Sequence, residues 1–411
     1  MNPQSRAQGT RLRSPSGLSV EINANGSIRR MTCGDVTVNL FVGDEVEGGP
    51  ANLWLRTRAD GTATCVPLLG PRSTTRFFER SRTTLIGAGE RDGLRYRLAF
   101  VLSADAPAWF WQVHVENDGD ARDIDLIYTQ DLALAPYGLI RLNEYYVSQY
   151  VDHTALTHAE RGCVVASRQN LAVGGRHPWC IIGSLRCGVS FATDALQVYG
   201  LASRAGRTGA GLAAGLPGQR LQHEHSMIAI QDAPASLASG AHATFGFFGL
   251  LAENHVTATS MTDLVAVDQA LALPEAKPPG VTTLPGSPPA PAPTLFSNGA
   301  LLEALELDER ETTELFGAER RHEERDDQGR LLSFFCGEDR HIVLRAKELC
   351  VQRPHGHLLR TGRHLTPDEA ALTSTTWMNG VFHSMLTQGH VSFNRFLSTN
   401  RTYLGLFRSH G

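Results

Sequence analysis

Three consecutive segments in which apolar and polar residues alternate constrain the fold of this chain more than any other feature. Apolar residues recur at every second position in residues 94–102, with Arg95 and Arg97 between them. Residues 109–116 and 124–128 repeat the alternation, and an Asn-Asp-Gly-Asp turn at 117–120 joins them. A period of two is typical of a strand with one face buried. The pattern therefore predicts three neighbouring antiparallel strands.

Further strand signals extend this pattern over the first two thirds of the chain. Leu18, Val20 and Ile22 alternate with polar residues, and Asn25-Gly26 then predicts a tight hairpin. No segment with a helical period of useful length precedes residue 260, and the glycine-rich residues 205–218 are expected to form a loop. We predict a mainly β fold, a large antiparallel β-sandwich of two packed sheets. The other predicted strands are 36–42, 53–57, 163–167, 179–185, 188–193, 221–231 and 242–253.

A proline-rich segment separates two predicted domains. Residues 274–294 hold eight of the twenty prolines, which favours an extended, semi-rigid linker. A short closing helix is expected at 261–273, and a capped helix at 300–316 opens the second domain. Strand signals return at 331–336, 341–348, 357–360, 381–387 and 394–397. The predicted domains are a disordered leader (1–16), a β-sandwich (17–265), a linker (266–296), and a helix with an incomplete second β-sandwich (297–411).

Composition narrows the class of protein and its partners. A formal net charge of −4 with interspersed charges gives no basic footprint for nucleic acid. No apolar run approaches 18 residues, and the first 14 residues lack an apolar core, so we expect neither a membrane span nor a secretory signal. Seven scattered cysteines, none in a C-x-x-C pair, indicate reduced thiols. We therefore expect a cytoplasmic location.

The segment 141–179 is the leading candidate for a binding site. Carboxylate, amide and guanidinium groups stand there beside tyrosines, and neither strand nor helix periodicity is evident. Such groups beside flat rings suit a polyhydroxylated ligand such as a sugar. The alternative is a packed loop whose polar groups cap one another. The predicted substrate-binding residues are Asn143, Glu144, Tyr146, Gln149, Asp152, His153, Arg168, Gln169 and Asn170.

Other chemistries receive weaker support from the residues. Glu144 and Asp152 have the residue types of a glycosidase pair, but no neighbour in the sequence indicates a shifted pKa. Asp152 with His153 and His158, the pair His223 and His225, and the pair His355 and His357 each lack a third metal ligand, so we expect no metal. The glycine-rich loop lacks a P-loop Lys, and no serine stands in a nucleophile elbow. A second polar stretch, at 353–357 with 377–380 and 387–390, is either ligand-facing or a set of turns.

Several motifs in order along the chain resemble a known family. They include NEYYVSQYVDH (143–153), SRQN (167–170), HPW (177–179), YTQDLALAPYG (128–138) and RPHGH (353–357). The chain resembles the N-terminal super-sandwich region of glycoside hydrolase family 94, in particular its 1,2-β-oligoglucan phosphorylases and the C-terminal part of cyclic β-1,2-glucan synthases. In that family an (α/α)6 barrel carries the general acid, and inorganic phosphate is the nucleophile. No run of paired amphipathic helices is present here, so the resemblance implies a carbohydrate-related fold without a catalytic residue.

Three functions follow as hypotheses. The first is a non-catalytic β-sandwich that binds a β-1,2-glucan oligosaccharide and forms one wall of a pocket. The second is half of a split phosphorylase, active only with a separate barrel-containing chain and inorganic phosphate as co-substrate. The third is a structural domain that self-associates as a homo-oligomer. We expect no cofactor and, for the chain alone, no activity.

Overall fold

The chain divides into two compact units. A computed structural model describes residues 9–43, 48–59, 62–70, 72–200, 209–221, 225–277, 310, 313–314, 317–325, 331–336 and 340–343. The first unit comprises Met1–Gly200 with Thr208–Ala292, and the second comprises Leu201–Arg207 with Pro293–Gly411. The domain boundaries drawn from the sequence stay a prediction.

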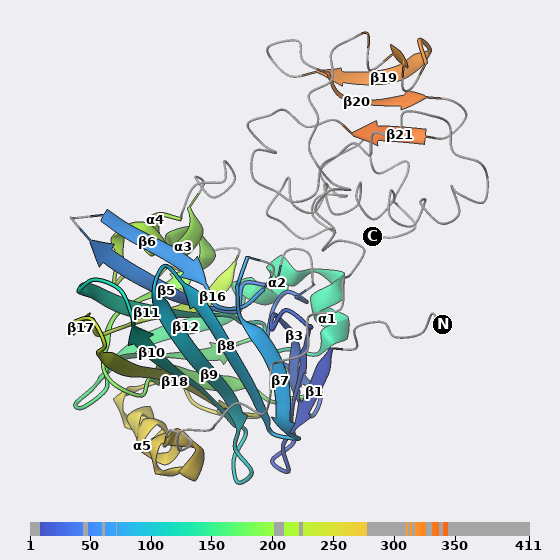
Figure 1. Cartoon of the computed structure of the whole chain (residues 1–411). Coiled ribbons are helices and arrows are strands. Elements are labelled where there is room, and N and C mark those ends of the chain that lie inside the picture. The colour runs from blue at the N-terminus through green and yellow to red at the C-terminus, as the bar shows by residue number, and fades with distance from the viewer. Residues whose placement is uncertain are drawn as a thin grey trace, which may run out of the picture. The chain divides into compact units, whose positions relative to one another are not determined.

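Strands dominate the described residues of the chain (Figure 1). The strands of the first unit are β1 (Thr10–Arg13), β2 (Leu18–Ile22), β3 (Ile28–Cys33), β4 (Val36–Thr37), β5 (Asn52–Ala59), β6 (Thr62–Pro67), β7 (Arg76–Ser81), β8 (Thr84–Arg91), β9 (Leu94–Leu102), β10 (Ala108–Asn117), β11 (Arg122–Asp131), β12 (Val151–His158), β13 (Gly162–Gln169), β14 (Trp179–Ser184), β15 (Gly188–Asp194), β16 (Ser226–Asp232), β17 (Ala235–Leu237) and β18 (His242–Ala252). Its helices are α1 (Tyr137–Leu142), α2 (Glu144–Gln149), α3 (Ala195–Tyr199), α4 (Ala210–Ala214) and α5 (Val265–Ala272), with 3-10 turns η2 (Met261–Leu264) and η3 (Pro274–Ala276). The mainly β prediction is confirmed.

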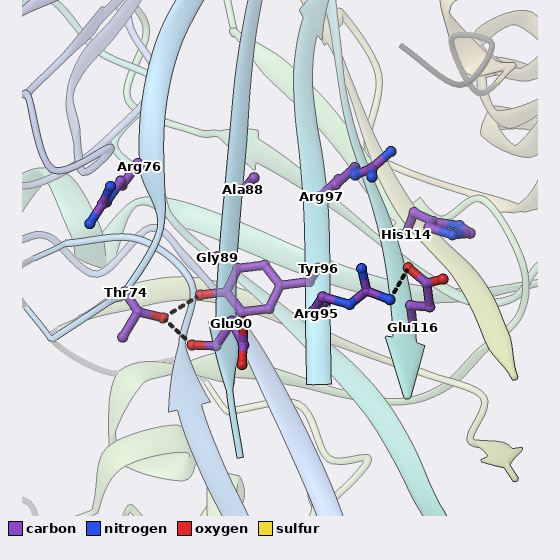
Figure 2. A pocket seen from close by; sticks show the side chains of 10 residues that line it. All are labelled: Thr74, Arg76, Ala88, Gly89, Glu90, Arg95, Tyr96, Arg97, His114 and Glu116. Atoms are coloured by element: carbon purple, nitrogen blue, oxygen red, sulfur yellow. Dashed lines mark hydrogen bonds and ion pairs between the residues drawn. The ribbon is translucent and has the colours of Figure 1, made fainter. Parts of the chain in front are cut away.

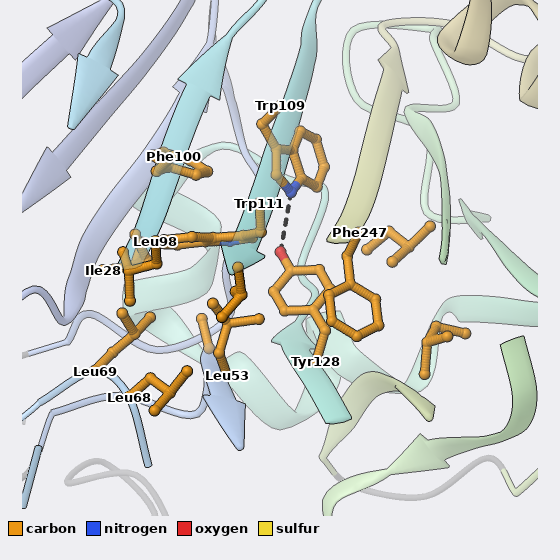
Figure 3. Close-up of a cluster of buried hydrophobic side chains, with 14 of the residues drawn as sticks. Ile28, Leu53, Leu68, Leu69, Leu98, Phe100, Trp109, Trp111, Tyr128 and Phe247 are labelled. Carbon is orange, nitrogen blue, oxygen red and sulfur yellow. Dashed lines mark hydrogen bonds between the residues drawn. The ribbon is translucent and has the colours of Figure 1, made fainter. Parts of the chain in front are cut away.

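One large sheet supplies both layers of the sandwich. Its strand order is β6-β5-β11-β16-β15-β13-β14-β18-β10-β9-β8-β7, with β12 paired to β13 and β17 to β11. Five strands separate β10 from β11 in this order, yet Trp109 Nε1 of β10 donates to the Tyr128 hydroxyl of β11 at 2.9 Å (Figure 3). The sheet therefore curls until its two halves face each other. The two layers expected from the sequence exist, but as halves of one hydrogen-bonded sheet.

The core lies between these halves and consists of the inward residues of the alternating strands. Trp111 packs against Phe100 with ring centroids 4.3 Å apart, and Phe247 lies 5.5 Å from Tyr128 (Figure 3). All four side chains are at most 1% exposed. Aromatic side chains of this kind each bury about 150–250 Å² and dominate core energetics. The strands predicted at 94–102, 109–116 and 124–128 are confirmed as β9, β10 and β11.

A smaller sheet, β1-β2-β3-β4, closes part of the same core through Leu12, Leu18 and Val20. The predicted hairpin is present, because β2 and β3 pair as antiparallel neighbours around Asn25-Gly26. Gly26 has φ +78°, and a Cβ there would lie 2.1 Å from the Phe77 ring. Both the turn and the packing thus require glycine at this position.

Helix α5 covers part of the outer face of the sheet. Val267 and Ala270 of α5 belong to the apolar cluster that contains Phe110, Ile181 and Phe248 from β10, β14 and β18. The short closing helix predicted at 261–273 is confirmed by η2 and α5. The Gln112 side chain then donates to the backbone oxygens of Glu275 and Lys277, both at 2.8 Å, which holds the chain after α5 on this face.

Several local predictions differ from the structure. The strand expected at 36–42 is only β4, because Asn39 turns inward to bond Met31 N and the Phe41 carbonyl. The glycine-rich loop contains a helical turn, α4. Strands β1, β6, β7, β8, β12, β17 and β19 were not predicted. In β8 the glycines at 87 and 89 interrupt the apolar pattern. The side chains of Phe77 and Tyr96 occupy the space that a side chain at these two positions would fill.

The described part of the second unit is a three-stranded sheet of β19 (Arg320–Arg325), β20 (Leu331–Cys336) and β21 (Arg340–Val343). The strand predicted at 331–336 is confirmed, and β21 covers the start of that predicted at 341–348. Phe334 is buried beneath the Arg320 guanidinium, 5.6 Å away. The helix predicted at 300–316 lies almost entirely outside the described residues, as do the later strands and the second polar stretch. No helix in the described ranges is long and apolar enough to cross a membrane.

Candidate functional site

The polar–aromatic segment predicted as an irregular connection is regular structure. It folds into α1, α2 and the hairpin β12–β13. Asn143 caps α2, because its Oδ1 accepts from the Tyr146 backbone N at 3.0 Å. The helices are six residues each, too short to show a period, and β12 places His153 among its inward positions. The expectation of a non-periodic connection is therefore wrong. The hydrophobic pattern does not reveal these elements, because the helices are short and an inward strand position is a histidine.

His153 is a buried, neutral residue. Its Nδ1 lies 2.6 Å from Ser167 Oγ, and its Nε2 lies 2.9 Å from Ser226 Oγ. Burial lowers the pKa of His153 to about 3. Both ring nitrogens are thus used by hydroxyl groups of β13 and β16, an arrangement that joins the three strands.

The neighbouring candidates for a metal site also have protein partners. Asp152 forms an ion pair with Arg220 at 2.5 Å. His158 Nε2 lies 3.3 Å from Asp268, and its Nδ1 accepts from the backbone N of Glu160 and Arg161. Within the described ranges, no three His, Cys, Asp or Glu side chains are grouped to hold a metal ion. His223, His355 and His357 lie outside those ranges.

Arg168, Gln169 and Asn170 connect separate segments. Arg168 donates through Nε to the His255 carbonyl at 2.8 Å, through a second nitrogen to the Val256 carbonyl at 3.2 Å, and to Asn170 Oδ1. Gln169 is fully buried and donates to the carbonyls of Ala133 at 2.7 Å and Val147 at 3.2 Å. These hydrogen bonds occupy most of the side-chain N–H donors of Arg168 and Gln169. The side chains therefore position the surface above them, whatever their role toward a ligand.

An exposed polar–aromatic surface remains on α2 and its flanks. Tyr146 is 47% exposed and Tyr150 is 37% exposed, with ring centroids 4.9 Å apart at 58°. Asn143, Gln149 and Asn170 are exposed around these rings. We call these five residues the α2 surface. It presents two aromatic faces and amide groups to solvent, which is the arrangement that the sequence predicted for a sugar.

Glu144 differs from the rest of the segment because it is buried without compensation. It is 5% exposed, and its Oε1 has no hydrogen-bond partner among the described residues. Burial raises the pKa of Glu144 to about 7. Sequence reasoning found no neighbour to shift this pKa, and the cause is desolvation rather than a neighbouring charge. The group exchanges a proton near neutral pH, but no nucleophile or metal site accompanies it in the described structure.

The hydrophobic pattern did not indicate that Asp131 and Asp232 are buried, and the sequence singled out His225 only as a possible metal ligand. Asp131 Oδ2 accepts from the backbone N of Leu40 and Phe41 at 2.9 and 2.7 Å, whereas Oδ1 has no partner among the described residues. Burial raises the pKa of Asp131 to about 6. His225 packs edge-on against Phe41 at 4.6 Å, and burial lowers its pKa to about 4. The only available signal was the position of Asp131 within the 128–138 motif.

Comparisons with known families agree with this architecture. A family model described as the SOGP N-terminal domain matches residues 21–249. A second, described as a glycoside phosphorylase supersandwich domain, matches residues 318–411. A 1,2-β-oligoglucan phosphorylase from Listeria innocua serovar 6a is 29% identical over 402 residues, which cover 96% of this chain and 34% of the relative. The chain thus spans about a third of that relative's length, and the resemblance predicted to glycoside phosphorylases is confirmed.

The matches to solved structures are weak. A polysaccharide lyase has a TM-score of 0.38 at 10% identity, covering 58% of this chain and 33% of its own. A bacterial glucoamylase complexed with acarbose has 0.35 at 8% identity, covering 66% and 36%. A galactose 1-epimerase from Lactobacillus acidophilus has 0.34 at 10% identity, covering 60% and 94%. Scores of this size carry no functional argument.

Proposed function

Because the chain belongs to the SOGP N-terminal domain family, we propose that it forms the N-terminal β-sandwich part of a carbohydrate-active phosphorylase and contributes carbohydrate binding to it. The observation that carries this proposal is the collinear identity with a 1,2-β-oligoglucan phosphorylase over nearly the whole chain. The proposed ligand is accordingly a β-1,2-linked glucan oligosaccharide. Membership of glycoside hydrolase family 94 and a cytoplasmic location belong to the same proposal.

The α2 surface is the proposed place of contact. Tyr146 and Tyr150 offer ring faces, and Asn143, Gln149 and Asn170 offer amide groups to hydroxyls. The buried members of the predicted site support this surface from below. Gln169 joins the end of β13 to Val147 of α2, and Arg168 holds Asn170 in place. An open surface of this kind buries little of a ligand, so the expected affinity is weak.

In this proposal the reaction takes place in an (α/α)6 barrel, which is a different domain from the two units described above. In this proposal inorganic phosphate is a co-substrate of the complete enzyme, and the chain supplies one wall of its pocket. Incubation of the chain alone with a β-1,2-glucooligosaccharide and phosphate is expected to release no sugar phosphate. Turnover by the isolated chain would contradict the non-catalytic role, and turnover restored by a separate barrel chain would identify a split enzyme.

Titration of the chain with β-1,2-glucooligosaccharides tests the binding proposal. We expect calorimetric or NMR saturation with the unmodified chain and at least roughly tenfold weaker binding for Tyr146→Ala and Tyr150→Ala. Leu196→Ala is a matched control, because Leu196 is 46% exposed on a different helix, α3. Absence of saturation, or equal loss in the control, would contradict the assignment.

A specific observation favours one second candidate function. Leu139 and Leu142 of α1 are 39% and 76% exposed beside the exposed Tyr146. Contiguous exposed apolar residues mark interaction surfaces. In this alternative the α1–α2 face mediates self-association without a ligand. Light scattering after size exclusion distinguishes the two functions, since a monodisperse monomer that still binds the oligosaccharide excludes the alternative.

A further inference from the structure

A hollow of about 460 Å³ lies on the outer face of β7, β8, β9 and β10, and none of its lining residues belongs to the α2 surface (Figure 2). On β9, Tyr96 and Leu98 face the core, whereas Arg95 and Arg97 face the hollow. This volume is within the range of about 300–1,000 Å³ that is typical of small-molecule sites.

One row of residues across the hollow offers hydrogen-bond donors. Arg76, Ala88, Arg97 and His114 are consecutive cross-strand partners on β7, β8, β9 and β10. Ala88 is small, and Arg76 and Arg97 stand on either side of it (Figure 2). Adjacent strands are about 5 Å apart, so the two arginine backbones are separated by about 10 Å. Neither guanidinium has a hydrogen-bond or ion-pair partner among the described residues.

The next row offers acceptors. Glu90, Arg95 and Glu116 are partners on β8, β9 and β10. Arg95 is already used, because it binds Asp118 through two nitrogens and lies 3.4 Å from Glu116. The Glu90 carboxylate has no partner among the described residues. One side of the hollow therefore carries guanidinium groups that can bind an anion. The other side carries carboxylates that can accept hydrogen bonds from hydroxyl groups.

Tyr96 lines the hollow (Figure 2), but little of its ring is open to a ligand. It is 2% exposed, and its hydroxyl bonds Thr74 and Thr75 at 3.0 and 3.1 Å. A neutral sugar therefore gains neither stacking nor an ion pair here. An acidic group gains charge-assisted bonds from guanidinium donors, which are about twice as strong as neutral ones.

The Arg76 and Arg97 side chains point away from each other, and Arg97 points toward His114 (Figure 2). We propose that this hollow binds a monosaccharide that bears one acidic group, with the phosphate or carboxylate on Arg97 beside His114 and the hydroxyls on Glu90 and Glu116. The chemistry is shared by a hexose phosphate and a hexuronate. The site is independent of the α2 surface and of the proposed oligosaccharide ligand. It gives this domain a separate means of binding an acidic sugar.

His114 provides a readout inside the hollow. The pKa of His114 is lowered first by burial, then by His242, whose ring centroid is 5.0 Å away, and by Arg97, while Glu116 opposes this. An anion bound at Arg97 adds negative charge beside the imidazole. The pKa of His114 then rises toward its ordinary value.

The test uses the full chain with glucose 1-phosphate, glucuronate, inorganic phosphate and glucose as probes. We expect saturable binding of glucose 1-phosphate or glucuronate, together with an upward shift of the His114 NMR titration. Whichever of the two binds more tightly identifies the source of the acidic group. Arg97→Gln is expected to weaken binding at least roughly tenfold. Arg95→Gln, in which the lost guanidinium was already bound to Asp118, is expected to weaken it less than threefold.

Three results would overturn the proposal. The first is no binding of either acidic sugar, with an unchanged His114 titration. The second is glucose binding as tightly as glucuronate, which removes the role of the arginines. The third is equal loss in the Arg95 and Arg97 variants. Inorganic phosphate binding as tightly as glucose 1-phosphate would refute the part assigned to Glu90 and Glu116. Thermal unfolding of each variant confirms that the fold is retained.

Discussion

The segment 143–170 and the hollow of β7–β10 are both rich in charged and polar side chains, but they use them differently. In the segment, His153, Arg168 and Gln169 are at most 9% exposed and bond hydroxyl or carbonyl groups of other parts of the chain. In the hollow, Arg76 and Arg97 are exposed, without partners among the described residues. The same residue types thus stabilise the fold in one region and are available for a ligand in the other.

The comparison shows that a region rich in polar side chains does not always leave those side chains available to a ligand. A buried polar group must be paired, since an unpaired donor or acceptor costs about 1–3 kcal/mol. Most buried polar groups of the segment meet this requirement internally, with Glu144 Oε1 as an exception, and the α2 surface stays open to solvent. The hollow has no such requirement, because water solvates its charges. Substitutions should therefore affect stability in the segment and ligand binding in the hollow.

The largest expected effect is the pH dependence due to His153. Its pKa is about 3 in the fold against 6.5 for an ordinary histidine, so the unfolded chain takes up the proton first as the pH falls. This contribution is complete above about pH 6.5 and is lost as the pH falls toward 3, by about 3–5 kcal/mol. Urea unfolding between pH 7 and pH 4 should show a smaller loss in His153→Gln. Parallel curves for the two proteins would refute the role of this residue.

Arg168→Ala should destabilise the protein by about 2–4 kcal/mol, because it leaves the carbonyls of His255 and Val256 without their donors. Chemical denaturation at pH 7 measures this change. Arg168→Lys is a useful second variant, since a lysine retains charge but lacks the planar fork that reaches both carbonyls. A loss below about 0.5 kcal/mol, the usual effect of a surface substitution, would show that the segment resembles the hollow.

Glu144→Gln is expected to stabilise the protein at high pH. The pKa of Glu144 is about 7 in the fold and 4.5 ordinarily, so the unfolded chain loses its proton first. Stability is full below about pH 4.5 and declines as the pH rises through 7. Glutamine removes this decline, which we expect to amount to about 1–3 kcal/mol at pH 8. Unfolding at pH 5 and pH 8 tests it, and a gain of equal size at both values would contradict the cause given.

The smallest effect on stability is expected in the hollow. Arg97→Ala should change the free energy of unfolding by less than about 0.5 kcal/mol, because no described residue loses a bond. The same variant should lose affinity for the acidic sugar. A large loss of stability at pH 7 would instead place Arg97 in the structural group with Arg168.

The strands that face the core on one side were predictable because hydrophobicity reports burial directly. Residues 94–102 match β9 at both ends, and 331–336 match β20. Prediction failed where an inward position is polar or glycine. In β12 the inward His153 breaks the apolar pattern, and in β8 the glycines give way to Phe77 and Tyr96 from neighbouring strands. Such positions depend on partners that are distant in sequence.

The candidate site named from the sequence stays a prediction. The polar–aromatic composition singled out the segment, whereas the burial of Glu144 and the pairing of Asp152 with Arg220 could not be read from it. Asp131 and the hollow gave no distinct signal. In the hollow, Arg76, Arg97 and His114 come from three strands, so only the register brings them into one row.

The sequence alone determined the mainly β class, most strands of the sandwich and the resemblance to glycoside phosphorylases, because each depends on local patterns or collinear motifs. The tertiary structure alone decided that the sandwich is one curled sheet. It also decided which polar side chains are used internally and which face solvent. Those properties depend on contacts between residues far apart in the chain, such as Trp109 with Tyr128 and Arg168 with His255. A local pattern carries no information on such contacts, whereas the register and curvature of the sheet fix them.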